Sequence, residues 1–197
     1  MNAPVLTQTR SPWVVFTSSD DPWVTRETAA LDAQGGIIFH LDGREMTQPA
    51  SLFHAFARDL SFLGYFGHNW DALVDCLHDW HGPGHGEQNV AVLIDNADGL
   101  LDAEFLPLFV SVLCEAAWKA NLRLDADGIR DEDLSPFALH FVFLLEHTPP
   151  AAFAESVSKG QDVGLGFLDG RLTATLASLQ WPGSDPVTPF PQLPPRP

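Results

Sequence analysis

Three aspartates recur at every fourth position of one short segment, at Asp71, Asp75 and Asp79. The apolar positions of the same segment recur at helical spacing: Leu73, Cys76, Leu77 and Trp80. This spacing predicts a helix over residues 70–80 with the three carboxylates on one face. Like charges four residues apart cost a helix a few tenths of a kcal/mol each, and no Lys or Arg stands at a neighbouring helical position to offset them. The stripe is therefore either a solvated acidic face or an anionic binding surface.

The segment before this helix favours the binding surface. Tyr65 and Phe66 are adjacent aromatic residues between glycines, and exposed aromatic side chains are typical of binding hot spots. Either ring could instead belong to the core, Phe66 more plausibly than Tyr65, which is the only tyrosine of the chain. Asn69 is suited to cap the helix, and Asp71 falls in its first turn, where the helix dipole favours a carboxylate.

A second chemical possibility is a metal site or an enzyme. Histidines gather around the acidic stripe: His68, His78, His81 and His85. No spacing completes a four-ligand set, and exposed histidines near a helix C-terminus are favourable without a metal, so we expect no metal or other cofactor. The sequence also lacks a G-x-S-x-G elbow, a Walker loop and an H-E-x-x-H motif. The expectation is a protein that is not an enzyme.

Charge restricts the partners further. The 197 residues include 10 Lys+Arg and 26 Asp+Glu, for a formal net charge of −16. Such a chain is repelled by phosphate backbones and anionic lipid headgroups, so we expect no nucleic-acid or membrane partner and favour a basic protein. The first 13 residues lack the basic start and apolar run of a secretory signal, and Cys76 and Cys114 form no disulfide framework. Both features favour a cytoplasmic location. The sequence leaves the oligomeric state open.

The elements that position the stripe follow from apolar patterning. Strands are predicted at 36–41, 90–95 and 138–145, and helices at 49–62, 70–80 and 102–122, the last one bent near Pro107. This order predicts an α/β fold with a small parallel sheet. The predicted helical core consists of Phe53, Phe56, Leu73, Leu77, Trp80, Leu113 and Trp118.

The flanking segments have a different character. Residues 13–16 suggest a strand, 25–31 a short helix, and 163–176 a hairpin that turns at Asp169-Gly170. The hairpin could extend the sheet or pair with the 13–16 strand. Residues 123–136 are acidic and loop-like, and prolines crowd the sequence from 181 onward.

The run Tyr65-Phe66-Gly67-His68-Asn69-Trp70-Asp71-Ala72-Leu73-Val74-Asp75-Cys76-Leu77, with Trp80 after it, resembles the core motif of the barstar family of intracellular ribonuclease inhibitors. The resemblance covers residues 36–147. It implies a small three-stranded parallel sheet packed with helices, an N-terminal extension at 1–35, a hairpin extension at 148–180 and a Pro-rich tail at 181–197. It also implies an inhibitor, or immunity protein, whose helix aspartates stand in for RNA phosphates in the active site of a basic ribonuclease toxin.

The resemblance also implies the partner-binding residues: Tyr65, Phe66, Gly67, His68, Asn69, Asp71, Val74, Asp75 and Glu115. Asp75 would be the central anion, and Glu115 would add an acidic contact from the later helix. Two positions depart from the family, because Val74 stands in place of a tryptophan and His68 in place of an acidic residue. These departures leave an alternative open, in which the fold binds a non-ribonuclease toxin or a regulatory partner.

Overall fold

Six strands form one sheet in the order β2-β3-β4-β1-β6-β5 in the computed structural model, which describes residues 3–62, 64–78, 88–122 and 136–177. The strands are β1 (Val14–Ser18), β2 (Ile37–Asp42), β3 (Val90–Asp95), β4 (Leu139–Leu145), β5 (Val163–Leu168) and β6 (Arg171–Leu176). The α-helices are α1 (Pro22–Ala33), α2 (Pro49–Asp59), α3 (Trp70–His78), α4 (Leu106–Leu122) and α5 (Ala154–Val157). Short 3-10 turns are η1 (Gly43–Glu45), η2 (Ala97–Leu100) and η3 (Pro150–Phe153).

The α/β class is confirmed, but the parallel sheet is larger than the three strands predicted. The predicted strands β2, β3 and β4 are adjacent and parallel, and β1 adds a fourth parallel strand beside β4. The hairpin of β5 and β6 joins through an antiparallel pairing of β6 with β1. Both alternatives for the hairpin are therefore realised at once, since pairing with β1 is what extends the sheet. The segments before and after the predicted 36–147 domain share its sheet.

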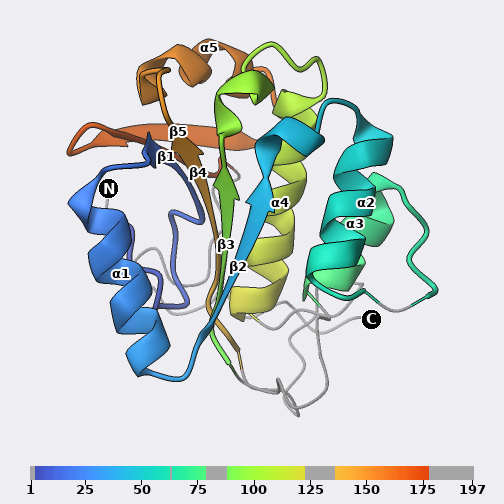
Figure 1. The fold of residues 1–197 in the computed structure, drawn as a ribbon, viewed down its shortest axis with the longest axis horizontal. Coiled ribbons are helices and arrows are strands. Elements are labelled where there is room, and N and C mark those ends of the chain that lie inside the picture. The colour runs from blue at the N-terminus through green and yellow to red at the C-terminus, as the bar shows by residue number, and fades with distance from the viewer. Residues whose placement is uncertain (1–2, 63, 79–87, 123–135, 178–197) are drawn as a thin grey trace, which may run out of the picture.

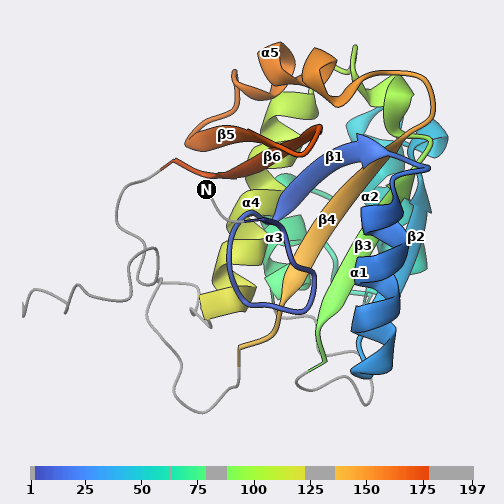
Figure 2. The same ribbon diagram turned by 90° about the vertical axis from the view of Figure 1, so that its left-hand side faces the viewer.

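Helices cover both faces of this sheet (Figures 1 and 2). α1 lies on one face, and α2, α3 and α4 lie on the other. Successive strand side chains alternate between the two layers: Phe141 and Phe143 pack in the core under α4, whereas Val142 and Leu144 pack in the core under α1. Strands buried on both faces need apolar residues at every position, which explains the continuous runs at 90–94 and 141–145.

Two helix predictions change at their N-terminal ends. The helix predicted over 102–122 begins at Leu106, so Pro107 lies in its first turn and does not bend it. A first-turn residue needs no amide hydrogen bond, which makes proline favourable there. The helix predicted at 25–31 extends over 22–33, because the Asp21 side chain caps it by accepting the amide N–H of Trp23 at 2.9 Å.

The predicted helical core is confirmed at Phe53, Phe56, Leu73, Leu77 and Leu113, all of which are buried. Trp118 is partly buried against the core. Trp80, residues 123–135 of the predicted 123–136 loop and the predicted Pro-rich tail at 181–197 lie outside the described residues. Both cysteines are buried and neither forms a disulfide in the described structure, and burial raises the pKa of the Cys114 thiol well above its usual range. No helix within the described ranges is long and apolar enough to span a bilayer.

A buried histidine couples the N-terminal segment to the sheet and makes stability depend on pH. His140 of β4 is fully buried, and its Nε2 lies 2.9 Å from the carbonyl oxygen of Gln8. Burial lowers the pKa of His140 from 6.5 to about 4, and hydrogen bonds to backbone carbonyls offset only part of this effect. Between these values the unfolded chain binds more protons than the folded one. The stability that the neutral ring provides is therefore complete above about pH 6.5 and lost as the pH falls toward 4.

We expect the free energy of unfolding to fall by about 3 kcal/mol from this group alone across that interval. Urea unfolding of the wild type and of His140→Gln, measured at several pH values, isolates the contribution. Between pH 6.5 and about 4 the wild type should lose this contribution and His140→Gln should not, so the difference in unfolding free energy between the two proteins should change with pH. If the unfolding free energy changed equally with pH in both proteins, the pH dependence could not be assigned to His140.

Candidate functional site

The loop at 64–69 and the helix α3 carry most of the predicted site residues. Asn69 caps the helix as predicted: its Oδ1 accepts the amide N–H of Ala72 at 2.8 Å, and its Nδ2 donates to the Gly67 carbonyl at 3.3 Å. Gly67 lies against this cap, because a Cβ at that position would stand 3.1 Å from Asn69 Nδ2. A larger residue at 67 would crowd the cap, so this part of the motif fixes where α3 begins.

Asp71 and Asp75 are both exposed and stand one turn apart on the same face of α3. Neither carboxylate forms an ion pair with any residue in the described part of the chain. Asp42 and Asp59 differ, since each carboxylate is bonded to an arginine, Arg44 and Arg58 respectively. The α3 aspartates are thus available for a partner. Asp79, the third residue of the stripe, lies outside the described residues.

The two adjacent aromatic residues have opposite environments. Tyr65 is 73% exposed, whereas Phe66 is only 7% exposed. The Phe66 ring packs edge-on against Phe62 and Phe53, at centroid distances of 5.2 and 6.2 Å. Val74 is likewise buried, at 4% exposure. The structure therefore gives Phe66 and Val74 core positions in place of the surface positions expected for partner-binding residues, because their side chains fill the layer beneath α3.

His68 is exposed and held in an uncommon backbone conformation, with φ at 49°. Its ring lies 4.7 Å from that of Phe66 and 5.4 Å from that of His54 on α2. His54 was not among the residues predicted from the sequence. It occupies an exposed position of an amphipathic helix, and no sequence pattern links it to the loop. The structure adds it to the edge of the site.

Glu115 lies on α4, the helix that packs directly against α3 (Figure 1). Its side chain is about half exposed, and one carboxylate oxygen lies 3.2 Å from Lys119 Nζ, one turn further along. The structure thus places Glu115 on the neighbouring helix, as the resemblance implied. Unlike Asp71 and Asp75, this carboxylate already has a cation of its own.

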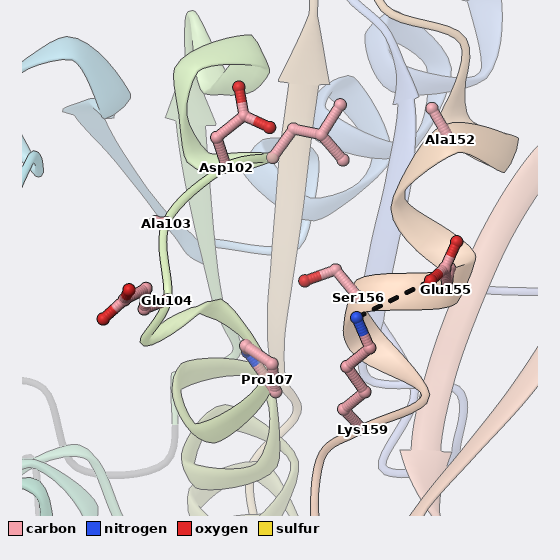
Figure 3. A pocket seen from close by; sticks show the side chains of 9 residues that line it. Asp102, Ala103, Glu104, Pro107, Ala152, Glu155, Ser156 and Lys159 are labelled. Carbon is pink, nitrogen blue, oxygen red and sulfur yellow. Dashed lines mark ion pairs between the residues drawn. The ribbon is translucent and has the colours of Figure 1, made fainter.

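Two other kinds of functional site would be a metal centre and a pocket away from α3. Within the described ranges, no three His, Cys, Asp or Glu side chains are placed to share a metal ion. His81 and His85 lie outside those ranges. An open pocket of about 460 Å³ lies between the start of α4 and α5 and is lined in part by Asp102, Glu104 and Lys159 (Figure 3). None of the predicted site residues lines it.

Comparison with known proteins identifies the same region. Residues 37–124 match the family model Barstar, described as barstar (barnase inhibitor). The match begins at the first residue of β2 and includes α2, the 64–69 loop, α3, β3 and all of α4. Among curated proteins, none matches this chain.

Proposed function

We propose that this chain, which contains a barstar-family domain at residues 37–124, is a protein inhibitor that binds and blocks the active site of a basic ribonuclease toxin. The observation that carries the proposal is the pair of exposed aspartates Asp71 and Asp75 on α3, inside the matched region, neither of which is paired with a cation in the described part of the chain. We define the inhibitory surface as Tyr65, Gly67, His68, Asn69, Asp71 and Asp75, with Glu115 beside it on α4.

The chemistry of the target supports this surface. A ribonuclease active site uses Arg, Lys and His side chains to bind phosphate and to stabilise charge in phosphoryl transfer. A carboxylate can accept the same hydrogen bonds, and arginine binds it in a bidentate geometry. A carboxylate fixed on a capped helix therefore occupies the phosphate position without offering a bond to cleave. Asp75, nearer the middle of α3 than Asp71, is proposed as the central anion.

The whole-chain charge supports fast encounter. A net charge of −16 attracts a basic partner over distances longer than contact, and this attraction raises the association rate. An inhibitor of a lethal enzyme benefits from reaching the enzyme before its substrate does. We also propose that the protein acts in the cytoplasm as an immunity protein, which agrees with a sequence whose two cysteines provide no disulfide framework.

The direct test is titration of a barnase-type ribonuclease with the full chain, at low and moderate salt. We expect inhibition that is complete at a stoichiometric ratio and that weakens as salt screens the charges. The absence of inhibition at either salt concentration would contradict the ribonuclease assignment and direct the search to another toxin class.

A further inference from the structure

The outer edge of the sheet at β5 has backbone groups with no hydrogen-bond partner among the described residues. β5 is the last strand of the sheet and turns back into β6 at Asp169-Gly170 (Figure 2). In a two-residue hairpin the hydrogen-bonded pairs alternate outward from the turn, and the bond from the Ala177 N–H to the Asp162 carbonyl fixes this alternation. Val163, Leu165 and Phe167 fall between the bonded pairs. Their N–H and C=O groups therefore point away from β6, and no described residue bonds to them.

This edge also lacks the features that usually prevent strands from pairing. The sequence of β5, Val-Gly-Leu-Gly-Phe-Leu, has no charged residue and no proline, whereas the opposite edge strand β2 carries His40 and Asp42. Three large apolar side chains are strongly exposed in the described part of the chain. Tyr65 belongs to the inhibitory surface, Phe167 is on β5 with 53% exposure, and Leu108 is on α4 with 45% exposure.

Leu108 lies about one helical turn before Ser111 on α4. The neighbouring Ser111 hydroxyl donates to the Gln161 carbonyl at 2.6 Å, which ties this part of α4 to the start of β5. Val163 and Leu165 pack on the α4 side of the sheet, and by the two-residue alternation of a strand Phe167 points to that side too. An added strand would therefore gain both backbone hydrogen bonds and apolar contacts on one face.

We propose that the occupant of this edge is a second copy of the chain, paired antiparallel through β5 about a two-fold axis at Leu165. This register places Leu165 opposite its symmetry mate, Phe167 opposite Val163, and Gly164 opposite Gly166. Each outward-facing residue then meets another outward-facing residue, so the free N–H and C=O groups satisfy one another. The exposed Phe167 ring gains a β-branched cross-strand neighbour, a favourable pairing. The strand is complementary to itself, as a two-fold interface requires.

Charge favours this edge over other surfaces for self-association. Two copies with a net charge of −16 repel each other, and β5 is a segment where neither copy presents a charge. Of the flanking carboxylates, Asp169 lies within 3.7 Å of Arg171 Nη1. The remaining repulsion should be reduced by salt. Dimerisation should thus strengthen with salt, whereas inhibition of a basic ribonuclease should weaken.

The test is the molar mass of the full chain by light scattering, from micromolar to millimolar concentration at low and high salt. We expect a concentration-dependent dimer that strengthens with salt. Phe167→Glu, which sets a carboxylate at the interface, should weaken dimerisation by about tenfold or more. The matched control is Tyr65→Glu, which makes the same change at an exposed aromatic residue of the inhibitory surface and should leave the dimer intact.

The experiment distinguishes failure of the proposed β5 dimer from failure of the proposed ribonuclease inhibition. Phe167→Glu should retain ribonuclease inhibition, and Tyr65→Glu should weaken it, so loss of one activity does not imply loss of the other. A wild type that stays monomeric at every concentration and salt level tested would overturn the β5 pairing. The β5 edge would then pair with a strand of another protein or with no strand. A dimer that persists in a folded Phe167→Glu variant would overturn it as well.

Discussion

Asp75→Ala should weaken binding to a basic ribonuclease by about 2–5 kcal/mol, the usual cost of truncating one partner of a hydrogen-bonded charge pair at an interface. The loss is large because the partner's cations would stay desolvated without their anion. Asp75→Ala should leave the fold intact. Asp75 is exposed, has no ion pair in the described structure and lies one turn from the like charge of Asp71, so its removal should change the free energy of unfolding by less than about 0.5 kcal/mol.

Two variants separate a specific contact from the general acidity of the chain. Asp32→Ala removes one negative charge from an exposed position of α1, across the sheet from α3 (Figure 1), and should alter affinity only slightly. Asp75→Asn keeps the size of the side chain and removes the charge, and it should behave like Asp75→Ala. Inhibition constants and urea midpoints should be measured for all three. Equal losses in Asp32→Ala and Asp75→Ala would reduce the role of α3 to long-range attraction.

The start of α3 could be predicted from sequence because its determinants are local. Asn69 caps a helix whose apolar residues recur at the right spacing, and both features lie within one short segment. Which of the two rings, Tyr65 or Phe66, is buried could not be predicted in the same way. They are neighbours in a loop without a period, and only the packing of Phe66 against Phe53 and Phe62 decides which ring is buried.

The size of the sheet was underestimated for a different reason. Patterning identifies a strand, but it does not say which strand lies beside it. Val14 of β1 pairs with Phe141 on one side and Ala174 on the other, partners far along the chain in sequence. The same limit applies to the histidine on α2, since the proximity of His54 to His68 depends on how α2 and the loop pack.

The central place of β1 changes how the flanking segments relate to the region that matches the Barstar family model. β1 lies between β4, which follows the matched region, and β6 of the hairpin. Both neighbours and β1 itself are outside residues 37–124. An ion pair joins these segments on one side of the sheet: Arg171 of β6 donates to both carboxylate oxygens of Asp21, at 2.6 and 2.9 Å. Its guanidinium also lies 5.1 Å from the centre of the Trp23 ring.

Arg171→Ala should destabilise the whole fold by about 3–5 kcal/mol, because it leaves the carboxylate of Asp21 poorly solvated and without its cation. The side chains of Arg171 and Asp21 are only 12% and 13% exposed. Burial alone would raise the pKa of Asp21, but hydrogen bonds from Arg171, Thr17 and the Trp23 amide hold it at about 2. The stability from this depressed pKa is present above the ordinary value of 3.8 and lost as the pH falls toward 2, and the variant should lose much of that acid dependence.

Arg44→Ala is the matched control, since Arg44 also binds an aspartate, Asp42, but through a side chain that is 71% exposed. Its removal should destabilise the fold much less than Arg171→Ala, because water solvates an exposed ion pair and screens it. Urea unfolding of both variants, of Asp21→Asn and of the Asp21→Asn, Arg171→Ala double variant measures the coupling between Asp21 and Arg171. The double variant should be less unstable than the sum of its single changes, because the uncompensated charge is gone. If Arg171→Ala unfolded no more easily than Arg44→Ala, the two flanking segments would be joined to each other by β-sheet pairing and apolar packing alone.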